Sequence, residues 1–171
     1  MRLHINNKGM SLIELIISMA ITAIILSMII MLISGASHSF RRTNDEVNLQ
    51  MEAQIAINQL SAIAMGATKI DEVPSTPSDK KYIINGIAGK ESYGVVYIDS
   101  VHKLYLIQKT PTVTVADLAT VTDENNLLAE YVTSLEINNP TGSKTATISI
   151  SFKLGEDTYS ISKKVKIRNI K

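Results

Sequence analysis

The sequence predicts an α+β protein in which a long N-terminal helix packs on a small antiparallel β-sheet and the first half of that helix crosses a membrane. Three features support this fold class: an uncharged apolar run over residues 15–33, an amphipathic helical repeat after it, and two alternating runs near the C-terminus that a short turn joins. A chain of 171 residues suits one anchor and one small domain, because domains commonly hold about 100–150 residues.

The apolar run is the strongest physical signal in the chain. It extends from Leu15 to Ile33 without a charge and is interrupted only by Ser18, Thr22 and Ser27. About 20 apolar residues at 1.5 Å rise per residue span the ~30 Å hydrocarbon core of a bilayer. A helix that is apolar on all sides is hard to bury in so small a domain, which disfavours a soluble core helix. We therefore assign residues 10–33 to the transmembrane half of the helix.

A second helical pattern follows the apolar run, over residues 34–66. Its apolar positions recur every three or four residues, which places them on one helix face: Leu49, Ala53, Ile57, Leu60 and Ala64. The pattern predicts one helix from about residue 11 to about residue 65, with Gly35 as a candidate bend because glycine weakens helices. The prolines and serines within residues 71–81 predict a loop.

The remainder, residues 67–171, is predicted to form the β-sheet domain. Residues 93–99 and 103–109 are rich in β-branched and aromatic side chains and read as a hairpin. Apolar and polar residues alternate over 146–154, and the apolar positions of 159–167 share one parity after a turn at 155–157, which is typical of paired, half-buried strands. Residues 116–122 fit a loop or a short helix, and residues 127–137 fit a strand or a helix followed by a strand.

Composition excludes several classes of function. Lys and Arg number 17 against 16 Asp and Glu, so no strong bias toward nucleic acid or acidic substrates follows. The absence of Cys excludes disulfides, thiolate metal sites and a cysteine nucleophile. His4, His38 and His102 form no ligand pair, the acidic pairs fall in predicted turns, and residues 122–126 fit a Ca²⁺ loop poorly. We therefore expect no enzyme, no metal and no cofactor.

A basic tail is the one charged run of interest. Five cations fall in the last nine residues: Lys163, Lys164, Lys166, Arg168 and Lys171. Such a tail is able to contact DNA phosphates, although no aromatic residues alternate with it for base stacking. Three of them, Lys164, Lys166 and Arg168, are expected on the outer parity of the last strand, where charge also blocks unwanted strand pairing. We favour that second interpretation over DNA binding.

The boundary before the apolar run is more specific. Residues 8–15 read Lys-Gly-Met-Ser-Leu-Ile-Glu-Leu, and the basic residues Arg2 and Lys8 precede the span. Positive charge before a first span favours keeping that end in the cytoplasm. The apolar run is too long for an ordinary secretory signal. This boundary resembles the class III signal of type IV pilins and pseudopilins.

The resemblance implies a set of expectations. Residues 1–9 would be a leader that a prepilin peptidase removes by cutting between Gly9 and Met10, after which Met10 is N-methylated. Glu14 would pair with the N-terminus of a neighbouring pilin subunit during filament assembly, and a carboxylate at the edge of an apolar helix is costly unless it serves a function. The fold would be the pilin fold, anchored once in the cytoplasmic membrane with the C-terminal domain outside, and later part of an extracellular filament.

The overall layout also resembles the minor pilins and minor pseudopilins of the J/W-like group, and the lack of a Cys pair favours a minor over a major subunit. The machine, whether pilus, secretion system or competence system, stays open. Two alternatives also stay open: a single-span membrane protein whose domain binds a ligand or a surface, and a DNA-binding subunit of an uptake pilus.

Overall fold

The computed structural model describes residues 11–87, 91–139 and 143–169. The chain forms two compact units, Met1–Thr43 and Asn44–Lys171. One helix, α1 (Leu12–Gly66), contributes to both units and runs without interruption through Gly35. The predicted helix of residues 11–65 is therefore confirmed to within one residue at each end.

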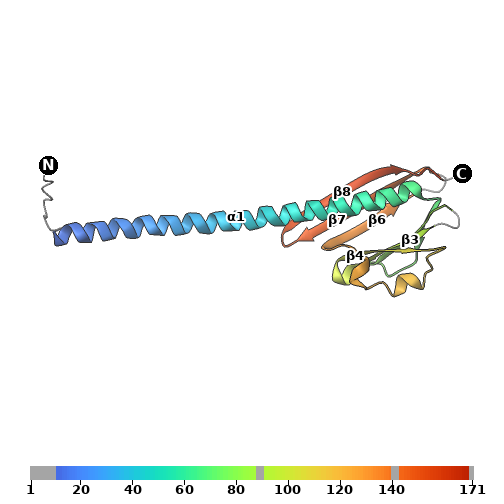
Figure 1. Ribbon diagram of the computed structural model, residues 1–171, viewed down its shortest axis with the longest axis horizontal. Helices are drawn as coiled ribbons and strands as arrows, with labels where there is room; N and C mark the ends of the chain where they lie inside the picture. Colours follow the sequence, from blue (N-terminus) through green and yellow to red (C-terminus); the bar gives the residue numbers. More distant parts are fainter. Residues whose placement is uncertain (1–10, 88–90, 140–142, 170–171) are drawn as a thin grey trace, which may run out of the picture. The chain divides into compact units, whose positions relative to one another are not determined.

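The strands form two antiparallel sheets. The five-stranded sheet has the order β1 (Lys69–Val73), β2 (Lys80–Asn85), β3 (Ser92–Ile98), β4 (Lys103–Lys109) and β5 (Leu127–Ala129). The three-stranded sheet has the order β6 (Val132–Asn138), β7 (Thr145–Leu154) and β8 (Asp157–Lys166). Figure 1 shows β6, β7 and β8 alongside the C-terminal turns of α1. The α+β class is confirmed, with its strands divided between two sheets rather than gathered in one.

One face of the C-terminal half of α1 forms the centre of the main core. Leu49, Ala53, Ile57 and Leu60 are buried there together with side chains from both sheets. Small residues on this face, including Ala56 and Ala64, are fully buried as well. Burial of apolar surface contributes about 25 cal/mol per Å², so the shared core stabilises the packing of this helix face with side chains of both sheets.

The C-terminal hairpin agrees closely with its sequence pattern. β7 buries alternate side chains, Ala146, Ile148, Ile150 and Phe152, while the residues between them face outward. Ten residue pairs join β7 to β8 in continuous register, from Thr145↔Lys166 to Leu154↔Asp157. The predicted hairpin at residues 93–109 is also confirmed, as β3 and β4.

The prediction of a loop over residues 71–81 is wrong at both ends, because the observed loop is shorter than the predicted one. Residues 71–73 belong to β1 and residues 80–81 to β2, so that the loop is limited to residues 74–79. Asp71 and Glu72 accordingly lie on a strand, where each forms an ion pair with a lysine. The ambiguous stretches resolve into a short 3₁₀ helix, Asp117–Ala119, and into β5 and β6 with another 3₁₀ turn, Glu124–Asn126, before them.

A second apolar cluster covers the other face of the five-stranded sheet. Val113, Leu118 and Val121 come from the segment between β4 and β5, and they pack on Val96 and Tyr105. A Cβ atom on Gly94 would clash with the side chains of Leu118 and Ile107. Glycine at this position therefore lets the segment lie close against β3.

The carboxylate of Asp117 stabilises the segment between β4 and β5 through hydrogen bonds and an ion pair. Asp117 accepts hydrogen bonds from the Thr114 backbone N–H (2.8 Å) and hydroxyl (2.7 Å), and it pairs with Lys109 Nζ at 2.7 Å. The hydrogen bond from Lys109, followed by those from Thr114, lowers the pKa of Asp117 to about 2. Because the folded pKa lies below the usual value, the stabilisation is present above about pH 4 and is lost as the pH falls toward 2.

The Asp117→Asn variant should therefore lose part of the acid sensitivity of the fold. The difference in unfolding midpoint between wild type and variant should be largest above pH 4 and should vanish near pH 2, because a protonated Asp117 no longer attracts Lys109. Urea unfolding of the full chain in detergent micelles, followed by circular dichroism across this range, measures it. A difference that persists unchanged at pH 2 would contradict the expectation.

Replacement of a buried serine should stabilise the protein. Ser61 is fully buried on the core face of α1, and its Oγ has no hydrogen-bond partner. Ser61→Ala removes an unpaired polar atom and improves helix propensity, so we expect an increase of about 1 kcal/mol in the free energy of unfolding. Denaturant titration in micelles measures the change. Ser39→Ala, on an exposed position of the same helix, is the control for propensity alone and should give less than half of that gain.

Candidate assembly segment

The N-terminal end of α1 carries the features that bear on function. Ser11 precedes the first helical residue, and the Glu14 backbone N–H donates to Ser11 Oγ at 3.3 Å. In return, the Ser11 backbone N–H donates to Glu14 Oε2 at 3.4 Å. This reciprocal pair is a capping box, which satisfies backbone donors that the helix itself leaves unpaired. The Ser-x-x-Glu spacing of residues 11–14 is the sequence signal for this capping box.

Glu14 is the acidic residue of the first helical turn and is exposed. Its position favours a negative charge, because the helix dipole is positive at this end. Only one of its carboxylate oxygens accepts a hydrogen bond within the described part of the chain. The other oxygen, Oε1, is therefore available to a cation from outside the chain.

The apolar part of the helix exposes all of its side chains. Every residue from 11 to 44 is exposed, and large hydrophobic side chains there are 46–80% accessible. By length and composition this helix is able to cross a membrane. Apolar side chains that are exposed on all sides of a helix are suited to lipid or to other helices rather than to water.

The three hydroxyl residues within the apolar run are satisfied internally. Ser18 Oγ donates to the Leu15 carbonyl at 2.8 Å, Thr22 Oγ1 to the Ser18 carbonyl at 2.7 Å, and Ser27 Oγ to the Ile24 carbonyl at 2.7 Å. An unsatisfied polar group in hydrocarbon costs several kcal/mol. Since no hydroxyl of this run needs an outside partner, the polar interruptions are compatible with a lipid-facing helix.

The domain-covered half of α1 presents a second apolar surface, which the sequence analysis missed. Val47, Met51 and Ile55 are about half exposed, at 46%, 57% and 58%. Their i, i+4, i+8 spacing places them on one stripe, opposite the face that packs on the sheets. We call these three residues the outer stripe. The spacing of Val47, Met51 and Ile55 is visible in the sequence. The buried residues of the same helix have the same helical periodicity, so only their face was predicted to be apolar.

Other residues that the sequence singled out lie apart from this segment. His38 and His102 are exposed, and His102 ends the 3₁₀ turn after β3. Lys164 and Lys166 are exposed on β8, as expected. Arg168 is also exposed, as expected, but it lies beyond the end of β8 rather than on the strand. Gly9 and Met10, the expected cleavage and methylation positions, lie outside the described residues.

Comparison with known proteins points to the same segment. Residues 5–30 match the family model described as the prokaryotic N-terminal methylation motif. The matched range contains the Gly9–Met10 boundary, the capping box and most of the apolar run. No curated protein and no solved structure matches the chain.

Proposed function

We propose that this chain, whose N-terminal segment carries the type IV prepilin signature, is a minor pilin or pseudopilin in a type IV pilus or a related secretion or competence filament. The motif supports a pilin-like precursor that is processed by prepilin peptidase and assembled with other pilins. A long helix packed on antiparallel sheets is consistent with that class. The proposed role is structural, and the chain performs no catalysis of its own.

The observation that carries the proposal is the place of Glu14 within the matched motif. It lies in the first turn of an apolar helix, with one carboxylate oxygen free of partners in the described part of the chain. Cleavage after Gly9 would create a positive N-terminus at Met10 in every mature subunit. An amine from one subunit would then pair with Glu14 of its neighbour, and a low-dielectric surrounding strengthens such a pair.

The proposed pathway begins in the cytoplasmic membrane, with the domain on the outer side. Basic residues before the span support this orientation. During assembly the apolar half of α1 would leave lipid and pack among helices of other subunits, where its exposed side chains find apolar neighbours. The outer stripe would extend that contact into the domain-covered half of the helix.

The decisive experiment is the mass and N-terminal sequence of the chain from its host's membrane. A chain that begins at N-methylated Met10 is the expected result. A chain that still begins at Met1, in cells with active prepilin peptidase, would overturn the proposal and favour a single-span anchored domain. Quantification in sheared filaments tests the finer assignment: a few copies per filament fit a minor subunit, whereas a dominant band would make it the major one.

A further inference from the structure

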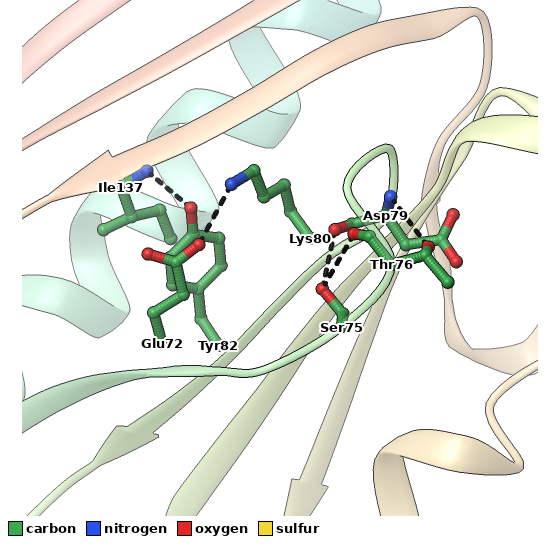
Figure 2. Close-up of polar contacts among 7 residues, drawn as sticks. All are labelled: Glu72, Ser75, Thr76, Asp79, Lys80, Tyr82 and Ile137. Carbon is green, nitrogen blue, oxygen red and sulfur yellow. Dashed lines mark hydrogen bonds and ion pairs between the residues drawn. The ribbon is translucent and has the colours of Figure 1, made fainter.

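A groove of about 750 Å³ lies beside β6, where the outer face of the three-stranded sheet meets β1 and β2. One side is formed by outward-facing residues of β6 and β7: Ser134, Glu136, Ser149 and Ser151. The other side is formed by residues of β1 and β2, among them Glu72, Lys80 and Tyr82 (Figure 2). The volume is within the roughly 300–1,000 Å³ that is typical of sites for small ligands. The groove is therefore large enough to hold a short oligomer of small polar units.

The lining of the groove is predominantly polar. Leu135 and Ile137 are only 2% and 6% exposed, so they offer little apolar surface to an occupant. The backbone of β6 is also partly occupied, because the Val132 N–H donates to the His102 carbonyl at 2.9 Å. The Ile137 N–H donates to Tyr82 Oη at 3.2 Å. An occupant of the groove is therefore expected to bond to side chains rather than to pair with the strand.

The groove carries one negative charge in excess. Lys80 Nζ forms an ion pair with Glu72 Oε1 at 3.0 Å (Figure 2). The hydrogen bond to Glu72 and its charge raise the pKa of Lys80, and Glu136 contributes least to that rise. Glu136 is exposed, and no ion pair or hydrogen bond joins its side chain to another of the described residues. Two carboxylates and one ammonium leave a net charge of −1 in this lining, which favours a ligand with a cationic group.

Two buried groups at the groove have unused hydrogen-bonding capacity. Tyr82 is 1% exposed, and its hydroxyl accepts from the Ile137 N–H, but its own proton has no acceptor among the described residues. Burial raises the pKa of Tyr82, so this proton is retained. The buried Oδ1 of Asn139, which also lines the groove, has no hydrogen-bond partner in the described part of the chain. Because buried polar groups are normally hydrogen-bonded, one free donor and one free acceptor indicate a ligand that supplies both.

We propose that the groove binds a short oligosaccharide that contains an amino sugar, with the protonated amine at Glu136 and sugar hydroxyls at Tyr82 and Asn139. A hydroxyl both donates and accepts, so one kind of group satisfies the free proton of Tyr82 and the free oxygen of Asn139. The hydroxyls of Ser149 and Ser151 offer further partners along the groove. This binding function goes beyond the proposed filament role, because it requires only the folded domain.

The test uses the full chain in detergent micelles and the chitosan-derived glucosamine trisaccharide, at about pH 6, where amines are protonated and glutamates are ionised. NMR titration of the backbone amides should show saturable shifts at Glu136 and Ser149. Cellotriose has the same linkage and a hydroxyl in place of each amine, and it should bind at least about fivefold more weakly, because it lacks the charge-assisted bond to Glu136. Spermidine supplies amines without hydroxyls and should also bind at least about fivefold more weakly.

Each result of this titration bears on the proposal. The absence of saturable shifts with the glucosamine trisaccharide would overturn it. Equal binding of cellotriose would overturn the role of the amine, and equal binding of spermidine would overturn the assignment to a sugar.

Matched variants locate the site. Glu136→Gln should reduce binding of the glucosamine trisaccharide to the level of cellotriose, whereas Glu156→Gln, at an exposed carboxylate between β7 and β8, should leave it unchanged. Ser134 and Ser160 are both exposed and both lie opposite Ser151, but Ser134 lines the groove and Ser160 does not. Ser134→Gln places a longer side chain in the groove and should weaken both trisaccharides at least about fivefold, while Ser160→Gln should not. Equal weakening by the two members of either pair would overturn the location.

Discussion

The Glu14→Gln variant is expected to reach the membrane and to lose its leader, yet to enter filaments at least about tenfold less than the wild-type chain. The neutral amide cannot form an ion pair with a neighbour's N-terminal amine, and loss of one member of a buried charge pair costs roughly 2–5 kcal/mol, where each 1.4 kcal/mol is about tenfold in an equilibrium. Comparison of membrane and sheared-filament fractions by quantitative immunoblotting measures the effect.

Glutamine isolates the charge because it preserves the capping box. A Gln at the third helical position is also able to bond the Ser11 N–H, so helix initiation should be unaffected. Glu46→Gln is a matched control, since Glu46 is an exposed carboxylate of the same helix and accepts a hydrogen bond from Gln50 Nε2 at 3.4 Å. Filament entry of Glu14→Gln at the level of the Glu46→Gln control would refute the proposed pairing.

The elements with regular periodicity were predictable from the sequence. α1 is long and continuous, and the strict alternation in β7 reflects one face on the core and one in water. In β8 the alternation is interrupted at Lys163, which is exposed. In α1 and β7 the local pattern reports burial directly, because a single packed face imposes period 3.6 or 2 on the apolar positions. The Gly35 position shows the limit of propensity, since one glycine does not interrupt a helix of 55 residues.

β1 and β2 were missed because their pattern is not local. β1 reads Lys-Ile-Asp-Glu-Val, and the prolines that follow it favour a loop. What makes these residues strands is pairing with each other and with β3, and the charges of β1 are accommodated by ion pairs, Lys69–Asp71 and Lys80–Glu72. The division into two sheets likewise depends on long-range pairing that no window of the sequence contains.

For the candidate site, the sequence located Glu14 and the apolar run, and the match at residues 5–30 covers both. The groove lined by Glu72, Tyr82 and Ile137 was not predictable from the sequence, because the β1–β2 pair meets the distant β6 only through tertiary packing.

Two substitutions on opposite faces of α1 should separate folding from assembly. Leu60 is fully buried in the main core, whereas Met51 belongs to the outer stripe and is 57% exposed. Leu60→Ala removes buried methyl groups and leaves a cavity between helix and sheets, so we expect a loss of about 2–5 kcal/mol in the free energy of unfolding. Denaturant titration in micelles, with the β-sheet signal in circular dichroism as readout, measures it.

Met51→Ala should leave that stability within about 0.5 kcal/mol, as is usual for exposed positions, but should reduce entry into filaments. The physical reason is that an exposed apolar stripe gains by burial only when another apolar surface covers it, and assembly is where the proposal places that cover. If Met51→Ala assembles normally and folds normally, the outer stripe takes no part in subunit contact. If it destabilises the isolated chain as strongly as Leu60→Ala, the stripe is part of the folded core rather than an assembly surface.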